Sequence, residues 1–569
     1  MTPLMDRNKA LTVNFSQFLF AISMFLLIAP NYDNLLLITI DVLLIFFSGL
    51  MLFTSVHIHD KYFLTIIYTE AIVVGLFYYF AQGVSIYVLI IYLLLVAVGI
   101  KYNFLAEAML VNFLILTLST LAVFPNFGTD GMMLSYYAAY LFLHGENPYN
   151  PALTANIYSV FHLCKFIPIF GTPLSTGGVV TRYDYPALQM LILIPSVIFN
   201  INPNLITVAF YFLVAFLLYA KLRRVDKLLF LSFLLPYLFN INYRDFSAGG
   251  VTTLDWVFFV LLSLFFKDVK AKGVFYGLAL SLKQTPFALL PFYLISIYKE
   301  EGKSSLLKFI IYTAISFLAI NGYFIFLSPE YYFQGVLYPI VAPLIGISMS
   351  LSMIAISGFF YIYPLFFTLA IVIVMLTEVY FFWKYYDIFK DSWVFFPYFI
   401  FFVNYRALWN YFMSWPILGY ALPNGERERI NAINFKPLAI PVLLLISLGI
   451  FFHFAYTPYY TSINVKVLHI CEKDGEIYGF LLNVSYYPKS PSLPNCIKPY
   501  FRIFPDAPSI SANGYIFCSN ATVLKKDSWE IVKLYPPYKG YYVPAVPLEV
   551  EAYYWNLIGI ISVIPVNSS

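Results

Sequence analysis

The residues of this chain that could do chemistry lie around one carboxylate, Asp130. It follows a long apolar stretch and precedes a segment that we expect to be a short amphipathic helix over about 131–144, capped by Thr129 or by Asp130 itself. Ionisable groups placed in or beside apolar stretches are costly, so they indicate functional sites. A carboxylate in such a place can take a proton from a hydroxyl, which is general-base chemistry.

Further charged residues could complete a site around that carboxylate. The segment 181–188 carries Arg182 and Asp184 together with two tyrosines, and it leads back into an apolar stretch. Lys283 and Arg406 each interrupt a long apolar segment farther along the chain. The elements that position these residues therefore have to bring distant apolar segments together.

The composition is that of an integral membrane protein. The chain has 569 residues, of which 61% are hydrophobic and only 11% are charged, and its mean hydropathy is +0.79. Soluble domains carry about 25% charged residues, and apolar runs of about 20 residues can cross a bilayer as helices. The net charge of +4 is dispersed and forms no long Lys/Arg block, so no nucleic-acid partner is expected.

Basic residues predict which ends of the helices face the cytoplasm. Arg7 and Lys9 precede an apolar run without a small-residue cleavage site, which predicts a signal anchor and a cytoplasmic N-terminus. The expected fold is an all-α polytopic protein of the cell membrane with roughly 11–13 membrane segments, some of them broken or re-entrant. Full spans are expected at about 11–30, 35–54, 63–80, 84–100, 104–124, 204–220, 228–243, 252–266, 308–327, 361–383 and 437–456.

Two apolar segments conflict with the charge rule, because each has basic residues on both flanks. These are 273–298 and 393–422, and one full span cannot keep both of its ends in the cytoplasm. Pro286, close to Lys283, breaks a helix in the middle of the first segment. We therefore expect two half-helices that return to the same side, with Lys283 at their tip beside a polar cavity. A second broken segment is expected around Arg406.

Two parts of the chain are expected outside the membrane. The loop 125–203 is the longest polar connection, and its apolar stretch 187–199 is too short to span. The tail 457–569 alternates polar and apolar residues over short stretches, which predicts a small β-rich domain. The chain thus divides into N-terminal helices, an outer catalytic loop, a membrane core and an extracytoplasmic C-terminal domain, at residues 1–124, 125–203, 204–456 and 457–569.

Two sequence features agree with an outer location of the tail. It contains glycosylation sequons at Asn483 and Asn520, although motifs of three residues also arise by chance. The four cysteines all lie in the parts expected outside, where disulfides persist, and their three possible pairings are left open.

Several short motifs follow one another between about residues 104 and 300. They are Asp130, Tyr136 with Ala139, Gly145-Glu146-Asn147-Pro148-Tyr149, Tyr185-Pro186-Ala187-Leu188, and Gly273, Gly277 and Ala279 followed by Lys283 and Pro286. This order resembles the C-type glycosyltransferase superfamily, and most closely its polyprenyl-phosphate-mannose-dependent, mannosyltransferase-like branch. Two features depart from the family: four expected spans precede the Asp130 loop where one is usual, and the Trp-Trp-Asp-Tyr-Gly motif of oligosaccharyltransferases is absent.

The resemblance implies an inverting transferase that moves a hexose, with mannose expected, from a polyprenyl or dolichyl phosphate to an extracytoplasmic acceptor. It implies that Asp130 is the catalytic base. The cations expected to bind the departing lipid phosphate are Lys283, Arg182 and Arg406. The residues expected to bind substrate are Asn147, Tyr149, Asp184 and Tyr185. No metal or other cofactor is required. The partners are the lipid-linked sugar, membrane lipids and a glycan, protein or lipid acceptor.

Each of these residues also has a simpler reading. Asp130 could only cap its helix, and Lys283 could extend to the membrane interface. Arg182 and Asp184 could form a surface pair of little energetic value, and Arg406 could be a structural charge. The tyrosines could be packing or interfacial residues.

Two other functions remain open at the level of the sequence. A secondary transporter would have broken helices at matching positions of two halves, and the broken segments 273–298 and 393–422 suit that idea, although no repeat relates the halves. A membrane assembly protein without catalytic activity would need neither Asp130 nor Lys283.

Overall fold

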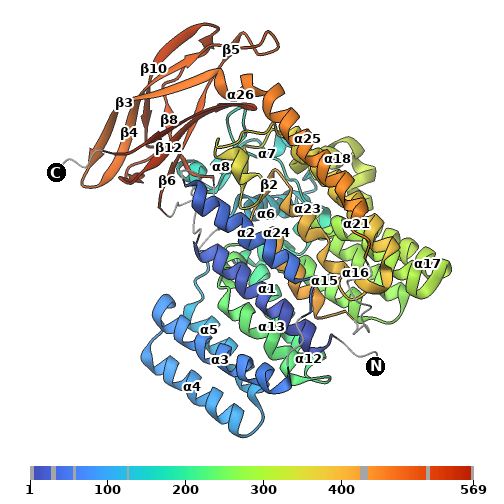
Figure 1. Ribbon diagram of the computed structural model, residues 1–569. Helices are drawn as coiled ribbons and strands as arrows, with labels where there is room; N and C mark the ends of the chain where they lie inside the picture. The colour runs from blue at the N-terminus through green and yellow to red at the C-terminus, as the bar shows by residue number, and fades with distance from the viewer. Residues whose placement is uncertain are drawn as a thin grey trace.

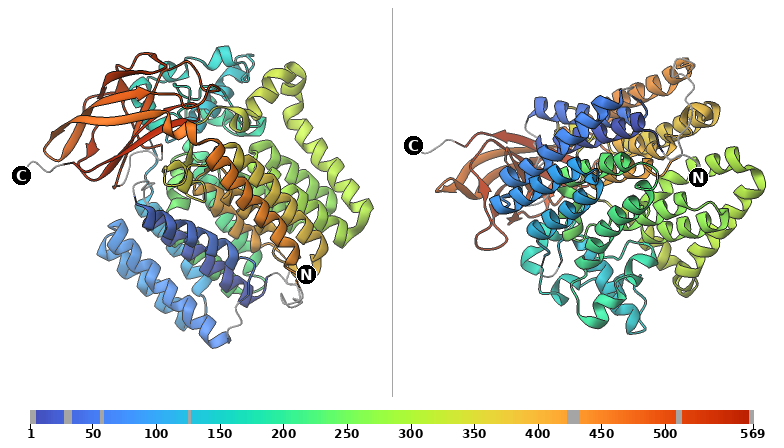
Figure 2. Two further views of the ribbon diagram at one scale, coloured as in Figure 1. Left: turned by 45° about the horizontal axis from the view of Figure 1, so that its top comes forward. Right: turned by 90° about the horizontal axis from the view of Figure 1, so that it is seen from below.

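The computed structural model describes residues 5–26, 34–55, 59–124, 127–422, 433–507 and 513–565. Figure 1 shows a body of packed helices joined to a β-rich part formed by the C-terminal residues. The views of Figure 2 show this β-rich part against one end of the helical body. A helical body with a C-terminal β-rich region agrees with the expected fold class.

Long helices make up most of the body. They are α1 (Arg7–Leu26), α2 (Leu35–Met51), α3 (Asp60–Gln82), α4 (Ile86–Lys101), α5 (Leu105–Thr120), α12 (Asn204–Leu222), α13 (Lys227–Phe239), α15 (Leu254–Phe265), α16 (Val269–Leu282), α17 (Leu290–Leu327), α21 (Leu365–Lys384) and α25 (Ala439–Ala455). Shorter elements between them are α14 (Asn242–Ala248), η2 (Thr285–Leu289), α22 (Tyr386–Phe389), η3 (Trp393–Phe395), α23 (Pro397–Phe402), α24 (Asn410–Gly419), η5 (Lys436–Leu438) and α26 (Thr457–Thr461).

Among the described residues, six helical stretches are long and apolar enough to cross a membrane. They are α1, α3, α12, Thr285–Leu327, α21 and the stretch Lys436–Ala455 that contains α25. Further apolar helices are shorter than a usual span: α2, α4, α5, α13, α15, the pair α10–α11 over Ala187–Phe199, and Trp393–Phe402. Every full span expected from the sequence overlaps one of these helices. The sequence predicted full-length spans at several places where the helices are shorter, because apolar residues continue past the helix ends.

Capping residues determine where several helices begin and end. Asn34, Ser85 and Asp226 accept hydrogen bonds from backbone N–H groups of the helices that follow them. Helix α3 ends at Gly83, which has the left-handed conformation (φ 64°) that glycine adopts without steric cost.

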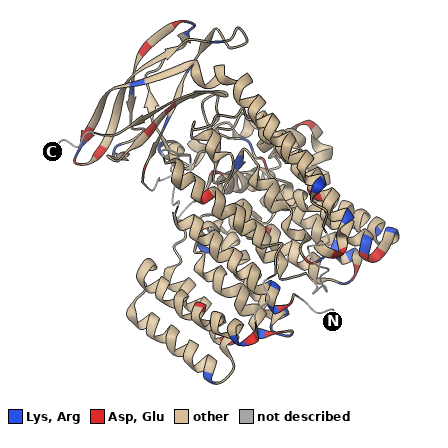
Figure 3. Cartoon of the chain, viewed as in Figure 1, with Lys and Arg blue, Asp and Glu red and all other residues tan. Residues whose placement is uncertain are grey.

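Contacts at one end of the body join the helix ends that the charge rule assigned to the cytoplasm. Arg7 forms ion pairs with Asp226 (2.6 Å) and Asp60 (3.2 Å), which joins the starts of α1, α13 and α3. Lys9 donates hydrogen bonds to Ser392 Oγ (3.1 Å) and to the carbonyl oxygen of Leu52. Figure 3 shows Lys and Arg residues gathered at this end, near the N-terminus. The helix ends that carry basic residues thus lie together at one end of the body.

The opposite ends of these helices also meet. Arg244 donates to Gln82 Oε1 (2.9 Å) and to Thr120 Oγ1, which brings the ends of α3 and α5 to α14. Asn202 donates to the carbonyl oxygen of Phe124, so both limits of the loop 125–203 lie together. These are the ends that the charge rule assigned to the outside.

Helix α16 and the first part of α17 form an antiparallel hairpin with Lys283 at its tip. Near the tip, the Tyr276 hydroxyl donates to the carbonyl oxygen of Pro286 (2.7 Å). At the open end, Lys272 pairs with Glu301 (2.5 Å). The break predicted in segment 273–298 is therefore present, and both of its basic flanks lie at the same end of the body.

Helix α17 turns again at Gly302 and then runs alongside α16. Gly302 has φ 81° and ψ 178°, a conformation that is essentially reserved for glycine. Gly277 of α16 lies so close to the second part of α17 that a Cβ on it would be 2.7 Å from Ser316 Cβ. This close packing places α16 and the second part of α17 side by side in parallel.

A second hairpin occupies the segment 393–422. Helices α23 and α24 contact each other through Tyr398 and Phe412 (ring centroids 5.0 Å apart). The segment returns to the end at which it starts, because Met5 N donates to the carbonyl oxygen of Leu422 (3.1 Å) and Lys9 donates to Ser392. The tip between them contains Arg406. The segment's second basic flank, Arg427 and Arg429, lies outside the described residues.

The outer loop 125–203 folds into short helices over the ends of the body. They are α6 (Asp130–Leu143), α7 (Pro151–Thr154), α8 (Ile157–Val160), η1 (Cys164–Phe166), α9 (Ile167–Phe170), α10 (Ala187–Leu191) and α11 (Ile194–Phe199). The second loop after α17 contains α18 (Pro329–Val336), α19 (Tyr338–Val341), α20 (Met353–Ile356) and the strand β1 (Ile347–Ser348), which pairs in parallel with β2 (Arg406–Ala407).

The C-terminal part is a sandwich of two larger sheets that share one apolar core. Its strands are β3 (Ile463–Lys473), β4 (Glu476–Tyr486), β5 (Cys496–Ile497), β6 (Tyr500–Pro505), β7 (Tyr515–Ile516), β8 (Cys518–Ser519), β9 (Leu524–Lys525), β10 (Ser528–Tyr535), β11 (Val543–Pro544), β12 (Leu548–Tyr554) and β13 (Leu557–Val563). One sheet has the order β11-β4-β10-β8 with β3 beside β4, and the other β13-β12-β6-β7. Asp474 and Gly475, both with positive φ, form the tight turn between β3 and β4. All four cysteines are free.

Candidate active site

Asp130 is the first residue of α6, and its carboxylate is held by two backbone groups. The helix is capped by Thr129, whose hydroxyl accepts a hydrogen bond from Met132 N (3.2 Å). The Asp130 carboxylate accepts one hydrogen bond from Gly131 N and one from Thr172 N, both 2.8 Å long. The predicted helix is confirmed, and capping is done by the neighbouring threonine.

The electrostatic surroundings of Asp130 suit a carboxylate that exchanges a proton. Burial raises its pKa above the ordinary value, whereas hydrogen bonds from Thr172 and Gly131 and the positive charge of Arg406 lower the pKa. The residue nevertheless keeps some solvent-accessible surface. A carboxylate that is mostly covered by protein and still partly accessible can be reached by a small polar group.

Tyr185 covers one side of this carboxylate. Its hydroxyl lies against Gly131, where a Cβ would come within 2.7 Å of the phenolic oxygen. The Tyr185 hydroxyl also interacts with Thr252, at the start of α15. Any larger residue at position 131 would therefore displace Tyr185 from its place beside Asp130.

Asp184 is a second carboxylate of the same site. Burial, and then the negative charge of Asp130, raise its pKa to about 7, while the charge of Lys283 acts in the opposite direction. Its Oδ1 atom is covered by protein and has no hydrogen-bond partner. Asp184 therefore lies between the general-base candidate and the tip of the first hairpin.

Lys283 is buried at that tip and is surrounded by negative and aromatic groups. Its Nζ donates to the carbonyl oxygen of Thr252 and lies 5.9 Å from the ring centroid of Tyr411 in the second hairpin. The carboxylates of Asp255 and Asp184 both interact with its charge. The two hairpins thus meet at this lysine.

Arg406 approaches from the tip of the second hairpin. Its guanidinium donates to the carbonyl oxygen of Ile345 (2.9 Å), and its charge reaches Asp130. The pairing of β1 with β2 fixes the backbone on which it stands. Arg406 and Lys283 therefore enter the same site from two different hairpins.

Several polar atoms around the hairpin tips are covered by protein but have no hydrogen-bond partner. Besides Asp184 Oδ1 they are Thr253 Oγ1, Asp255 Oδ2, Trp409 Nε1 and Asn410 Oδ1. Buried polar groups in folded proteins almost always have a protein, water or ligand partner. This group of atoms indicates a polar space that is suited to a hydroxyl-rich ligand or to ordered water.

Three residues proposed from the sequence lie apart from this cluster. Arg182 donates to Gln334 Oε1 (3.1 Å) and lies over the ring of Tyr338, near the surface. Asn147 accepts a hydrogen bond from Tyr149 N (3.1 Å) in a turn. Tyr149 is buried, and its hydroxyl donates to the carbonyl oxygen of Tyr185 (2.9 Å). Asn147 and Tyr149 thus support the segment that carries Asp184.

Sequence reasoning missed several residues of the cluster. Thr252 and Thr253 lie in a short connection with no distinguishing pattern, and Trp409 and Tyr411 look like ordinary aromatic residues of an apolar segment. The charge of Asp255 inside an apolar stretch was the one available signal.

The arrangement combines three carboxylates (Asp130, Asp184 and Asp255), two cations and aromatic and amide side chains around several unpaired buried polar atoms. Among the described residues, no group of three or more His, Cys, Asp or Glu side chains is placed to hold a metal ion. No protein family, no curated protein and no solved structure matches the chain significantly. The site therefore has to be interpreted from its own chemistry.

Proposed function

We propose that the protein is a membrane glycosyltransferase of the C-type kind, which moves a hexose from a polyprenyl or dolichyl phosphate to an acceptor hydroxyl. One observation carries the proposal. A carboxylate with restricted orientation, Asp130, shares a covered polar space with two cations, Lys283 and Arg406, that stand on two hairpin tips. A base and a phosphate site are the two functions that this transfer needs.

In the proposed reaction, Asp130 removes the proton of the acceptor hydroxyl. The acceptor oxygen attacks the anomeric carbon of the sugar from the face opposite the phosphate, and the bond between that carbon and the phosphate oxygen breaks. The lipid phosphate leaves with the electron pair, and Lys283 and Arg406 stabilise its added charge. Unpaired polar atoms such as Asp184 Oδ1 and Asn410 Oδ1 would bind sugar hydroxyls.

The proposal includes a location. The apolar helices would cross the cell membrane with the basic end of the body in the cytoplasm. Asp130, the polar space and the β-sandwich would then lie at the extracytoplasmic face. The partners would be membrane lipids, the lipid-linked sugar and a glycan, protein or lipid acceptor.

A secondary transporter is the second candidate, and the two hairpins favour it. Broken helices whose tips meet around charged groups also form the substrate sites of transporters. Such a protein would move a polar solute past Lys283 and Arg406 without making or breaking a bond.

The first test is transfer of labelled sugar from polyprenyl-phosphate donors to a membrane acceptor pool, with purified wild-type protein, Asp130→Asn and Glu146→Gln. Glu146 is an exposed carboxylate of the same loop and serves as the matched control. We expect Asp130→Asn to lower transfer at least about 100-fold, the lower limit for general-base catalysis, and Glu146→Gln to leave it unchanged.

The alternatives give different results in the same experiment. Equal transfer by wild type and Asp130→Asn would reject Asp130 as the base. Absence of transfer and of donor hydrolysis, together with solute flux in liposomes that depends on Lys283, would support the transporter. Absence of both activities would support an assembly role.

A further inference from the structure

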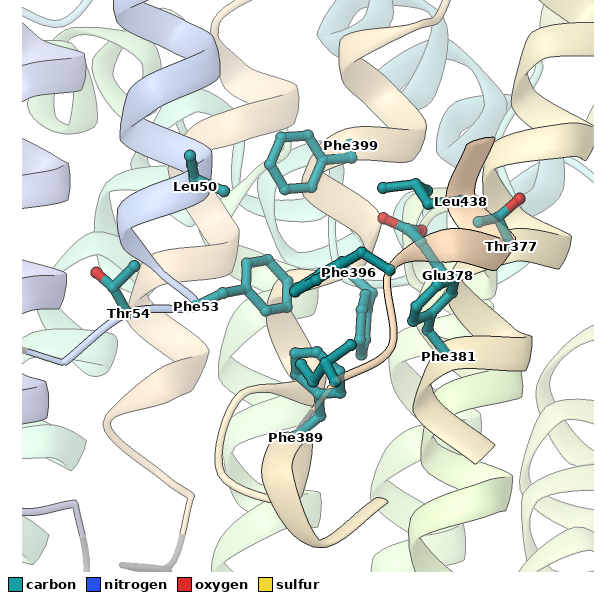
Figure 4. A pocket seen from close by; sticks show the side chains of 12 residues that line it. Leu50, Phe53, Thr54, Thr377, Glu378, Phe381, Phe389, Phe396, Phe399 and Leu438 are labelled. Carbon is teal, nitrogen blue, oxygen red and sulfur yellow. The ribbon is translucent and has the colours of Figure 1, made fainter. Parts of the chain in front are cut away.

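A lateral cavity far from Asp130 lies between the end of α2, α21 and the second hairpin. It has a volume of about 300 Å³ and is lined almost entirely by apolar side chains, among them Phe53, Phe396 and Phe399. Figure 4 shows these rings around the empty space. Leu50, which lines the cavity, is 43% exposed on the surface of the helical body. The volume is at the lower limit of cavities that hold small ligands.

One acidic side chain, Glu378, interrupts this apolar lining. It is only 9% exposed, and its Oε2 atom has no hydrogen-bond partner. Figure 4 shows its carboxylate directed into the cavity toward Phe396 and Leu438, whereas the hydroxyl of the adjacent Thr377 points away. A buried polar group without a partner is costly, so a ligand that donates a hydrogen bond here would remove that cost.

The depth of Glu378 restricts the kind of ligand. It lies six residues before Lys384, the last residue of α21, and at 1.5 Å per helical residue this is about 9 Å inside the helix end. Lys384 lies at the basic end of the body, where lipid phosphates would meet water. A group that reaches Glu378 therefore lies deeper than a phosphate, at the boundary between headgroups and hydrocarbon.

We propose that this cavity binds a lipid alcohol, a hydrocarbon chain that ends in a hydroxyl. The chain occupies the space between the phenylalanine rings, because apolar cavities do not hold water and the bilayer supplies hydrocarbon. The hydroxyl donates a hydrogen bond to Glu378. This inference rests on the proposed membrane location and is independent of sugar transfer.

The test uses a hexadecanol analogue with a photoreactive diazirine on its chain and the purified full-length protein. We expect cross-links on α2, α21 and the segment 386–399, with competition by hexadecanol and little competition by hexadecane. Loss of the acceptor in Glu378→Leu is expected to weaken labelling about tenfold, the value of one hydrogen bond. Glu378→Gln keeps a carbonyl acceptor and should retain labelling within a few-fold.

A second pair of variants tests the cavity without changing Glu378. Leu438→Trp adds bulk to the lining, whereas Leu443→Trp adds the same bulk to the exposed surface of α25. We expect only Leu438→Trp to abolish labelling, and Asp130→Asn to leave it intact even if sugar transfer fails. Equal competition by hexadecane and hexadecanol, or unchanged labelling in both Glu378→Leu and Leu438→Trp, would overturn the proposal.

Discussion

Two backbone groups far apart in sequence fix the orientation of Asp130. Gly131 N and Thr172 N each donate to a different carboxylate oxygen (2.8 Å). Each oxygen therefore keeps a free direction in which it can accept the proton of a substrate hydroxyl. Because burial raises the pKa of this carboxyl, the ionised form is a stronger base than an exposed aspartate, and its activity should be lost as the pH falls through the raised pKa.

The pKa of Asp184 leads to a prediction about stability. The carboxyl has a pKa of about 7 in the folded protein and an ordinary value of 3.8. Between these values the folded state retains a proton that the unfolded chain releases, so stability decreases with rising pH by up to about 1.4 kcal/mol per unit. Above about pH 7 this contribution is constant.

In Asp184→Asn no group at position 184 binds or releases a proton, so this pH dependence of stability is lost. We expect the variant to gain thermal stability relative to wild type as the pH rises from about 4 to about 7, and the difference to remain level above pH 7. Melting temperatures of both proteins in one detergent across this range would measure it, and Glu146→Gln provides the control. A difference that does not change with pH would show that Asp184 has an ordinary pKa.

The two hairpins are the elements that assemble the site. The sequence predicted both breaks and the assignment of Lys283 and Arg406 to one phosphate, but not the contacts by which the tips meet. Basic residues on both flanks and Pro286 indicated the first break, and the polar residues around Arg406 indicated the second. The charges and the hydrophobic periodicity of a segment predict how that segment lies relative to the membrane. Contacts between two hairpin tips depend instead on side-chain packing across the whole body. The buried, unpaired atoms of Trp409 and Asn410 were therefore beyond sequence reasoning.

Side-chain packing that the sequence does not reveal also explains why Arg182 lies outside the site. Its neighbour Tyr183 is buried against Tyr149 (ring centroids 5.1 Å apart), and Asp184 enters the site on the other side of that tyrosine. A sequence pattern shows that a charged pair is present, but the packing of the tyrosine between the two charges decides which of them reaches the site.

Gly302 forms the turn between the two parts of α17. Its φ of 81° and ψ of 178° are strained for any residue with a Cβ, so Gly302→Ala should destabilise the protein by about 1–3 kcal/mol. Gly322→Ala is the matched control, since this glycine is helical and has only the distant end of Phe326 nearby. The control should be neutral or stabilising by up to about 1 kcal/mol. Chemical unfolding in detergent would compare them, and equal effects would contradict this account of the turn.

At the scale of the whole molecule, the β-sandwich is attached to both loops that carry the site. Trp555 N donates to the carbonyl oxygen of Ser175 (2.8 Å), three residues from the Thr172 that binds Asp130. Arg502 donates to the carbonyl oxygen of Gly346 (2.7 Å), next to the Ile345 carbonyl that holds Arg406. The sandwich thus stabilises the positions of the base and of one cation.

Arg502 allows this attachment to be separated from the stability of the sandwich. It also forms a buried ion pair with Glu551 (2.9 Å). Arg502→Met leaves Glu551 buried without its main cation and should cost about 3–5 kcal/mol. Replacing both residues in Arg502→Met/Glu551→Leu should restore most of that stability, because an apolar pair can substitute for a buried ion pair. The double variant still lacks the hydrogen bond to Gly346.

The expected outcome is a double variant that is folded but impaired in transfer, with a larger effect on turnover than on the apparent affinity for donor. Thermal unfolding and transfer kinetics of the single and double variants would be measured together. Full activity in the stable double variant would mean that the sandwich does not position Arg406. If transfer activity falls only in proportion to stability across the variants, Arg502 has a structural role within the sandwich alone.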